Sequence, residues 1–475
     1  MKHLLPFGFH RLNSDSVVAV SSVGDYMYLE QSELIKLVDA PGNLPIKVKA
    51  ELQSKFFLSS SNPIGTSQLM RSRIASKKET IMSGSSLHII VPTLQCEHSC
   101  QYCQVSRKVE DNGYSMSPEQ IDAVCKTIFQ SQSKTLTIEF QGGDPLLRFD
   151  LIQRAIKKIQ ALNTFEQRKI RFIIASSLHQ LTFTMCEYLR EHNVYLSTSL
   201  DGPADLHNKN RPIKTRDSYQ RTLAGIALAR RVMGPESVSA LMTTTKSSLA
   251  YPEDIVDEYV AQKFNDIFIR PLSLYGFAKR NIKHLGYTQN EFSSFYKRAF
   301  ERVLYWNRKG VELREATAAL ILNKILSPFD AGYVDLQSPS GAGLATLVYN
   351  YDGYVYPSDE ARMLAETGDL SLRLGRIGES IDMLMNTSVM QRIVDSSIST
   401  QIPECSVCAF NPYCGPDPIG AQAEFGIIET SPRMTEHCKR NTWFFDFFFR
   451  KIKEADKEFI DLAYLWSQPI ENSDA

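Results

Sequence analysis

The segment Cys96-Glu97-His98-Ser99-Cys100-Gln101-Tyr102-Cys103 decides which fold class this sequence predicts. Its cysteines have the spacing C-x3-C-x2-C. Three thiolates can bind only three irons of a cubane [4Fe–4S] cluster, so the fourth iron has no protein ligand and is open to a small molecule. Sites closed by four protein ligands are usually structural or carry electrons, whereas an open position indicates a reaction centre. A broken zinc knuckle and a chance group of cysteines are the alternative interpretations.

The sequence around the cysteines favours the cluster. Residues 88–95, HIIVPTLQ, have the continuous apolar character of a buried strand, which places the cysteines on a loop between that strand and a helix. Tyr102 stands directly before the last cysteine. Residues 141–145, QGGDP, follow the next expected strand, and glycines there let the backbone approach a ligand closely. A GGDP segment alone would be a common turn, but after the cysteine motif it indicates a partner motif.

Composition describes a globular chain of balanced charge. The 475 residues suggest roughly two to four domains. Hydrophobic residues make up 43%, enough for a large core, and 53 basic residues balance 53 acidic ones, which argues against a nucleic-acid enzyme. The N-terminus lacks an apolar run of signal-peptide length, and residues 443–449 are too short to cross a membrane. Nine cysteines in this setting indicate thiolate chemistry in a reducing compartment, so we expect a cytoplasmic protein.

Strand-like and helix-like runs alternate between about residues 85 and 272. The expected strands are residues 87–93, 135–141, 170–176, 194–201, 238–244 and 266–272. Because these runs are apolar throughout, they predict a parallel sheet that is buried on both faces. The fold class is therefore α/β, a partial (β/α)6 barrel of the TIM type. Its chemistry is expected at the carboxyl ends of the strands, and the cysteine segment follows the first strand.

The rest of the chain suggests further modules around this barrel, which we place at residues 87–290. Residues 1–60 are expected to form a small α+β module, and the polar, serine-rich residues 61–86 a linker. Residues 291–330 have a helical pattern. Residues 331–440 are turn-rich and irregular, and residues 441–475 begin with an aromatic amphipathic helix.

A second group of cysteines lies in the irregular region. Cys405, Cys408 and Cys414 have the spacing C-x2-C-x5-C, and Cys438 follows after 23 residues. Four thiolates suit a zinc ribbon and a closed [4Fe–4S] cluster equally well when they are considered alone.

Together these motifs resemble the radical S-adenosylmethionine (SAM) superfamily. The resemblance implies a [4Fe–4S] cluster on Cys96, Cys100 and Cys103 that binds SAM, and reductive cleavage of SAM to a 5′-deoxyadenosyl radical that abstracts a substrate hydrogen. It also assigns cofactor-binding roles to Tyr102, Gly142, Gly143, Asp144, Ser177, Ser199 and Arg211. The family usually has Glu where this chain has Asp144, and often Asn beside the SAM ribose where this chain has Ser177.

The segment Ser199-Leu200-Asp201-Gly202-Pro203 and the later Arg211 resemble segments near SAM and substrate in relatives with peptide substrates. The resemblance gives Asp201 a catalytic role. A strand-ending turn followed by a helix cap is the structural alternative.

The C-terminal cysteines resemble the SPASM extension of peptide-modifying radical SAM enzymes. That extension normally binds two auxiliary clusters, but Ser340, Ser358 and Pro418 stand where this chain should have ligands of one of them. One auxiliary [4Fe–4S] cluster, on Cys405, Cys408, Cys414 and Cys438, is therefore expected. Asp359 corresponds to the proposed proton-accepting base of sulfatase-maturating enzymes, although an ordinary turn aspartate fits the same sequence.

Longer runs, among them CEHSCQYCQVSR and VYNYDGYVYPSDEARML, resemble the His-Xaa-Ser-system radical SAM maturases of the HxsB type over nearly the whole chain. This resemblance implies a peptide maturase whose substrate carries His-Xaa-Ser repeats. Its partners would be a second radical SAM protein of the HxsC type, a small HxsD-type protein and an electron donor such as flavodoxin or ferredoxin, with no nucleic acid and no membrane. The N-terminal module would be a winged helix that recognises a peptide. A sulfatase-maturating (formylglycine-generating) enzyme and a non-catalytic, cluster-bound scaffold for the peptide are the alternatives.

Overall fold

The computed structural model describes residues 4–60 and 62–468, which divide into two compact units. We call Ser83–Thr317 with Ala342–Gln391 the barrel unit. The terminal unit contains the described residues up to Met82, Ala318–Gly341 and those from Arg392 onward. The division runs through residues 331–440, which the sequence analysis treats as one domain. None of the described helices combines the length and apolar character needed to cross a membrane.

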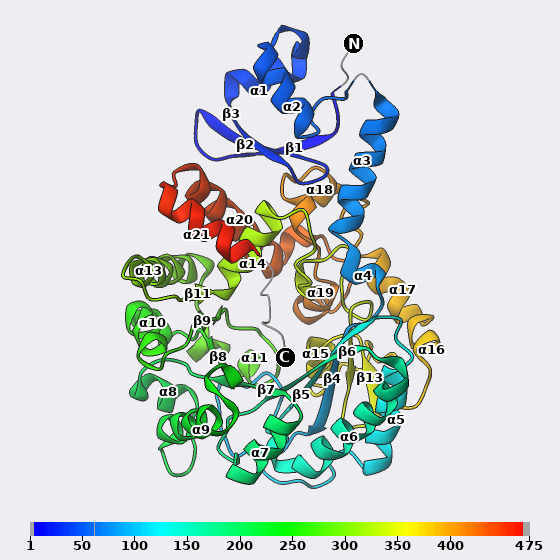
Figure 1. Ribbon diagram of the computed structural model, residues 1–475, viewed down its shortest axis with the longest axis vertical. Helices are drawn as coiled ribbons and strands as arrows, with labels where there is room; N and C mark the ends of the chain where they lie inside the picture. The colour runs from blue at the N-terminus through cyan, green and yellow to red at the C-terminus, as the bar shows by residue number, and fades with distance from the viewer. Residues whose placement is uncertain (1–3, 61, 469–475) are drawn as a thin grey trace. The chain divides into compact units, whose positions relative to one another are not determined.

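The barrel unit is built on one mostly parallel sheet (Figure 1). Its strands are ordered β10-β8-β7-β6-β5-β4-β12-β13-β14. The parallel strands that follow the sequence order are β4 (Leu87–Thr93), β5 (Thr135–Gly142), β6 (Lys169–Ala175), β7 (Val194–Ser199), β8 (Val238–Thr243) and β10 (Ile269–Arg270). This arrangement confirms the predicted α/β fold with a partial barrel of parallel strands.

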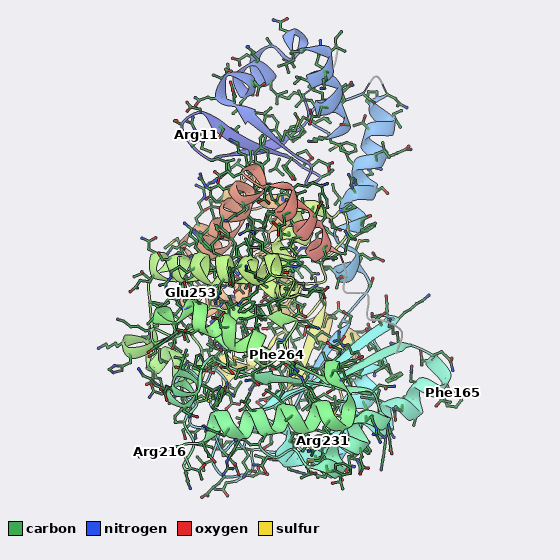
Figure 2. The ribbon with its side chains drawn as sticks, turned by 60° about the vertical axis from the view of Figure 1, so that its left-hand side comes forward. Arg11, Phe165, Arg216, Arg231, Glu253 and Phe264 are labelled. Carbon is green, nitrogen blue, oxygen red and sulfur yellow. The ribbon has the colours of Figure 1, made fainter. Side chains whose placement is uncertain are left out.

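Helices connect the strands, and their ends follow local sequence signals. They are α5 (Pro118–Ile128), α6 (Phe149–Glu166), α7 (Phe183–Glu191), α8 (Ala204–Asn210), α9 (Ser218–Met233) and α10 (Pro252–Ala261). For example, Ser117 caps the start of α5. Its hydroxyl accepts from the Gln120 backbone N–H, and the Gln120 side chain accepts from the Ser117 backbone N–H. Phe165, near the end of α6, is 90% exposed and points away from the ribbon (Figure 2).

The last expected strand, residues 266–272, is divided in the structure. β9 (Asp266–Ile267) pairs with β11 (Arg314–Glu315), whereas β10 pairs with β8. The expected helical connection at residues 291–330 consists of α13 (Gln289–Arg308) and α14 (Ala316–Leu326), separated by β11.

Three further strands extend the sheet on the other side of β4. β12 (Thr346–Tyr349) pairs parallel with β4, and β13 (Tyr354–Tyr356) and β14 (Gly375–Arg376) continue antiparallel. The helix α15 (Asp359–Ala365) follows β13. The sequence pattern predicts only an irregular region here, because a four-residue run such as TLVY is too short to assign from periodicity.

The terminal unit joins the N-terminal module to the C-terminal helices. The antiparallel sheet of β1 (Phe7–Arg11), β2 (Ser16–Ser21) and β3 (Tyr26–Glu30) precedes α1 (Gln31–Asp39) and α2 (Ile46–Ser54). The Tyr28 hydroxyl on β3 donates to the Phe449 carbonyl (2.8 Å) of α20 (Glu436–Lys453), and α21 (Lys457–Ser467) follows.

The segment that the sequence analysis describes as a linker is largely helical. It contains α3 (Pro63–Ser76) and α4 (Glu79–Met82). Asn62 caps α3 by accepting from the Gly65 backbone, and Pro63 occupies the first helical position, where its missing N–H costs nothing. Asn62 and Pro63 are both visible in the sequence as signals for the start of a helix. The linker was expected instead because residues 61–86 are rich in serine.

Candidate functional site

The cysteine segment forms a loop at the carboxyl end of β4. The Cys96 backbone N–H donates to the Lys108 carbonyl (2.8 Å) and the Cys103 N–H to the Cys100 carbonyl (3.2 Å). Cys96 and Cys100 are buried and Cys103 is partly exposed. Burial raises the pKa of the Cys96 thiol. Burial also raises the pKa of the Cys100 thiol, to about 11, although nearby Arg211 lowers it. The charges of Cys100 and Cys103 also raise the Cys96 pKa.

This donor set fits a three-thiolate cluster. Buried thiols with raised pKa values are neutral at neutral pH, and the positive charge of bound metal would deprotonate them. Within residues 4–60 and 62–468, no three His, Cys, Asp or Glu side chains converge as ligands of a single metal ion. The fit therefore rests on the chemistry of three neighbouring thiols on one loop, and the next strand supplies the groups that contact that loop.

The glycines after β5 allow a close backbone approach to the cysteine loop. Gly142 has φ of 128°, and a Cβ atom there would lie 2.3 Å from the Thr93 carbonyl oxygen. A Cβ atom on Gly143 would lie 2.2 Å from the Gln95 carbonyl oxygen. The Gly143 N–H donates to Thr93 (2.9 Å) and the Asp144 N–H to Gln95 (2.7 Å). The two predicted motifs therefore lie against each other.

Asp144 and Ser177 interact directly. The Ser177 hydroxyl donates to Oδ2 of Asp144 (2.5 Å), and the Ser176 hydroxyl donates to Oδ1 (2.6 Å). The backbone N–H groups of Ser177 and Leu146 add one longer bond to each oxygen (3.3 Å). Asp144 is 3% exposed, so these donors hold both oxygens of a buried carboxylate. The two positions at which this chain departs from the family pattern thus contact one another.

Tyr102, Asp201 and Arg211 form a second network beside the cysteines. The Tyr102 hydroxyl donates to Oδ2 of Asp201 (2.7 Å), and Nη1 of Arg211 donates to the Tyr102 oxygen (2.7 Å). The Thr243 N–H donates to Oδ1 of Asp201, which is fully buried (3.3 Å). Burial raises the pKa of Asp201, while Arg211 and the Tyr102 hydrogen bond lower it. The network ties the cysteine loop to the segment after β7, where Ser199 is the last residue of the strand.

Three histidines surround one serine at the same end of the sheet. Nε2 of His98 and Nε2 of His207 lie 3.1 and 3.2 Å from the Ser218 hydroxyl, and the rings of His98 and His179 are 4.4 Å apart. Burial lowers the pKa of all three and takes that of His98 to about 2, so they are neutral. Neutral rings support the loop without adding charge.

Asp359 is the first residue of α15. Nε and Nη2 of Arg362 both donate to Oδ1 of Asp359 (2.8 and 2.6 Å), and Arg362 is completely buried. The Asp359 side chain keeps 12% of its surface exposed. Ser358 caps α15 by accepting from the Ala361 N–H (3.2 Å).

Two of the positions where the SPASM pattern would place cysteine have local structural roles. Ser358 is the cap of α15, and Pro418 is the first residue of α19 (Pro418–Phe425), where proline is favoured. Ser340 occupies the third of these positions, and its backbone N–H donates to the Ser397 hydroxyl (2.8 Å).

The C-terminal cysteines lie together in the terminal unit. Cys405 is on α18 (Pro403–Ser406), and Cys438 is in the first turn of α20. Burial raises the pKa of Cys405 to about 12 and raises that of Cys414, and in both cases the charges of the other cysteines raise it further. Lys324 lowers the Cys414 pKa. The chemistry of four thiols suits both zinc and a closed iron–sulfur cluster, and in the described part of the chain these side chains do not converge on one metal position.

Glu139 is a partly buried carboxyl that the sequence motifs do not predict. It lies inside β5, and its Oε1 accepts from Nε2 of Gln141 (2.8 Å). Burial raises the pKa of Glu139 to about 7. The available signal was a carboxylate inside the strand-like run TLTIEFQ, two residues before a glutamine, because alternate residues of a strand share a face.

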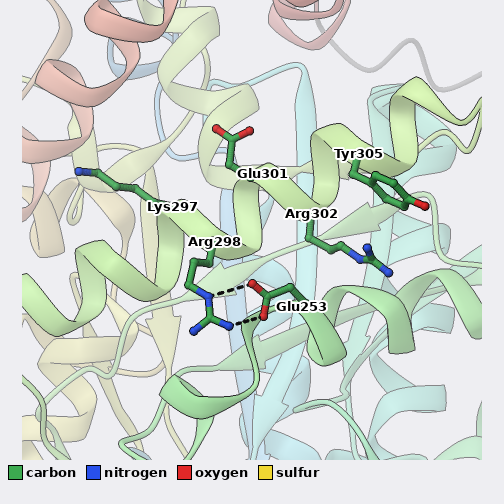
Figure 3. A pocket seen from close by; sticks show the side chains of 6 residues that line it. All are labelled: Glu253, Lys297, Arg298, Glu301, Arg302 and Tyr305. Carbon is green, nitrogen blue, oxygen red and sulfur yellow. Dashed lines mark hydrogen bonds and ion pairs between the residues drawn. The ribbon is translucent and has the colours of Figure 1, made fainter.

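A surface pocket between α10 and α13 contains none of these residues (Figure 3). Nε and Nη2 of Arg298 donate to the two carboxylate oxygens of Glu253 (2.9 and 2.6 Å). Arg302 forms the equivalent pair with Asp257 (2.7 Å for both bonds). Since its arginines are already paired, this pocket does not offer them to a ligand.

Known proteins share sequence with parts of this chain. Residues 90–258 match the sequence model of the Radical SAM superfamily. A cysteine-type anaerobic sulfatase-maturating enzyme of Clostridium novyi is 21% identical over 341 residues, which cover 70% of this chain and 87% of that protein. The radical SAM cyclopropyl synthase TigE of Paramaledivibacter caminithermalis is 22% identical over 258 residues, 51% of this chain and 50% of that protein.

Solved structures share the fold. Native anSMEcpe with bound AdoMet and Cp18Cys peptide superposes with a TM-score of 0.64 at 17% identity, over 80% of this chain and 99% of that one. Streptococcus suis SuiB bound to precursor peptide SuiA superposes with a TM-score of 0.54 at 12% identity, over 92% and 100%. At these identities the likeness concerns the fold, and the sequence match places a radical SAM domain at residues 90–258.

Proposed function

We propose that the chain, which carries a radical SAM domain at residues 90–258, is a peptide-modifying radical SAM enzyme. The observation that carries the proposal is the contact between the cysteine loop and the Gly142–Asp144 segment. Backbone hydrogen bonds join Thr93 to Gly143 and Gln95 to Asp144 at the carboxyl ends of β4 and β5. This is the end of a parallel barrel where ligands bind.

The residues of the site would position a cofactor rather than perform the chemistry themselves. A [4Fe–4S] cluster on Cys96, Cys100 and Cys103, with SAM on its open iron, would supply a 5′-deoxyadenosyl radical that abstracts a substrate hydrogen. We assign the SAM methionyl group to the backbone of Gly142 and Gly143. Asp144 keeps this backbone in place, because the serine hydroxyls already hold its two oxygens.

The second network would keep the cysteine loop rigid. Asp201 is fully buried and accepts hydrogen bonds from Tyr102 and Thr243, so we assign it a positioning role in place of the catalytic role that the sequence resemblance suggests. Arg211 would hold the Tyr102 hydroxyl and place a positive charge near Cys100. A guanidinium near a thiol favours the thiolate that binds metal.

Asp359 would accept the proton that leaves the substrate. Both hydrogen bonds from Arg362 go to Oδ1, so we assign the substrate proton to Oδ2. The buried guanidinium fixes the orientation of the carboxylate.

The proposal also names a peptide substrate and protein partners for this chain. We infer a substrate with His-Xaa-Ser repeats, HxsC-type and HxsD-type partners and a flavodoxin or ferredoxin as electron donor, on the long runs of sequence resemblance. The four cysteines of the terminal unit would hold one auxiliary [4Fe–4S] cluster. Two of the structures that share the fold carry bound peptides, which supports a peptide substrate.

Sulfatase maturation is the second candidate function. It is favoured by the similarity to the C. novyi enzyme over 70% of the chain. Ser340, Ser358 and Pro418 argue against it, because they stand where one auxiliary cluster would need thiolates.

Mass spectrometry of a co-produced substrate separates these functions. A protein with His-Xaa-Ser repeats and a sulfatase fragment would each be produced anaerobically with this chain and with its Cys100→Ala variant. We expect a mass change only in the repeat protein and only with the unaltered chain. A change in the sulfatase fragment alone would favour the second candidate, and no change in either protein would contradict the peptide-modifying function.

A further inference from the structure

The side chain of Glu139 lies on the inner face of the barrel sheet. Leu136, Ile138 and Phe140 on β5 are completely buried, whereas the alternate residues Glu139 and Gln141 are partly exposed. Successive side chains of a strand point to opposite faces. Glu139 and Gln141 therefore share the face opposite the apolar core, and the hydrogen bond between them joins neighbours on that face.

The strand register places Glu139 in a row that leads toward Asp359. Glu139 pairs with Ile89 on β4, Ile89 with Val348 on β12, and Val348 with Tyr356 on β13. Asp359 follows three residues after Tyr356. Across a flat sheet, three strand spacings would separate Glu139 from Tyr356 by about 14 Å.

Charges from both sides of the sheet nevertheless act on Glu139. The Asp359 carboxylate raises the Glu139 pKa, and Arg270 and Arg171 lower it. Arg270 ends β10, four strands away from β5 in the opposite direction from Asp359. In a flat sheet that distance would be about 19 Å. The strands curve into a partial barrel, so the face of β5 opposite its completely buried residues is the inner one, and Glu139 points into the barrel interior.

The pKa of Glu139 is therefore set by groups that act in opposite directions. Burial is the main reason that its pKa rises to about 7, and Asp359 adds to the rise. The Gln141 hydrogen bond, Arg270 and Arg171 act the other way. A new charge in the barrel interior would shift this balance, and a cation would favour the ionised carboxylate.

We propose that Glu139 is the proton-binding residue of the SAM chamber, and that the sulfonium cation of SAM displaces its proton to solvent. The proposal deepens the proposed function and rests on it. Glu139 lies on the strand that continues into Gln141, Gly142 and Gly143, to which we assign the methionyl group. No bond of SAM breaks in this step: the carboxyl loses a proton, buffer accepts it, and an ion pair replaces a neutral acid.

The linkage has a definite sign. In the free protein Glu139 titrates near neutral pH, and bound SAM would lower its pKa. SAM affinity should therefore increase as the pH rises through about 7, and Glu139→Gln should lose this part of the increase. S-adenosylhomocysteine lacks the positive charge on sulfur, so its affinity should depend less on pH.

Calorimetry measures this proton directly. The anaerobically reconstituted full chain would be titrated with SAM at pH 7 in buffers of different ionisation enthalpy, and the slope gives the protons released per SAM bound. The SAM α-ammonium group also loses a proton when its nitrogen binds the open iron, so the quantity that reports on Glu139 is the difference between variants. We expect the unaltered chain to release clearly more protons per SAM than Glu139→Gln, and this difference to be smaller with S-adenosylhomocysteine. Glu191→Gln, which carries the same substitution at an exposed position at the end of α7, should behave like the unaltered chain.

A second variant tests the same inference in case Glu139→Gln does not fold. Asp359→Asn removes a charge that raises the Glu139 pKa, so the rise in SAM affinity should move to lower pH. SAM binding without proton release, or equal release from Glu139→Gln, would overturn this inference alone. If the reconstituted chain did not bind SAM, the proposed function would fall as well.

Discussion

At the scale of single residues, Asp144 and Ser177 show how two departures from a family pattern can compensate. Aspartate reaches one methylene less far than glutamate. In this chain its oxygens instead accept from Ser176 and Ser177, both on the segment after β6. The sequence presents the two changes separately, since 33 positions separate Asp144 from Ser177. Only the fold shows that they belong together.

Removing one of these hydroxyls should weaken SAM binding. In Ser177→Ala, Oδ2 of Asp144 loses its short hydrogen bond in a buried place, and the backbone beside it becomes less rigid. We expect a dissociation constant for SAM about 5- to 30-fold higher, equivalent to roughly 1–2 kcal/mol. Equilibrium dialysis of the reconstituted chain measures it, with Ser294→Ala on the exposed face of α13 as the control. Equal affinity in both variants would contradict the role of Ser177.

Tyr102 should be important for stability as well as for the site. Tyr102→Phe removes a hydroxyl that donates to Asp201 and accepts from Arg211, and it leaves both groups short of a partner. The free energy of unfolding should fall by about 1–3 kcal/mol. Urea denaturation measures the change. Tyr305→Phe, where the side chain is 40% exposed, is the matched control and should cost much less. A similar cost for both would show that the network contributes nothing.

At the scale of elements, the contact between the β5 turn and the cysteine loop carries the site. Gly143→Ala would place a Cβ atom 2.2 Å from the Gln95 carbonyl oxygen, and this neighbour is backbone that cannot rotate away. We expect the loop to shift and the chain to lose iron from this site. Gly42→Ala, where nothing lies within 4 Å, is the control. Iron analysis after reconstitution checks the outcome, and full iron content in Gly143→Ala would contradict the account.

Sequence patterns predict the barrel strands well and the shorter elements poorly. β4 begins and ends where the apolar run does, because a strand buried on both faces has a continuous apolar sequence. The run at residues 266–272 looks equally continuous, but its two halves pair with different strands, and partner choice is a tertiary property. β12 was missed because four apolar residues fit a strand or a buried helix equally well.

The residues of the site also divide into those that sequence spacing predicts and those that only the fold brings together. The cysteines, the glycines and Asp144 were predictable because their chemistry depends on sequence spacing. The position of Asp201 within a buried network was not, since its partners Tyr102 and Thr243 come from distant segments. The pKa of Glu139 is raised mainly by burial and is modified by Asp359, Arg270 and Arg171, which come from other elements, so no local pattern reveals it.

At the scale of the whole molecule, the two groups of cysteines belong to different compact units. Iron content therefore tests the two sites independently. Two cubane clusters correspond to about eight irons per chain, whereas one cluster with a zinc ribbon gives about four irons and one zinc. We expect Cys405→Ala to lose about four irons and to retain SAM binding. Cys125→Ala, a buried cysteine on α5, is the control. Loss of zinc from Cys405→Ala would contradict the auxiliary cluster.

The central claim is that the open iron site of the barrel unit cleaves SAM. The most direct measurement is the release of 5′-deoxyadenosine when the anaerobically reconstituted chain is given SAM and dithionite. We predict release from the unaltered chain and from Cys125→Ala, and none from Cys100→Ala. Absence of 5′-deoxyadenosine from the fully reconstituted chain, or equal amounts from Cys100→Ala, would contradict the account.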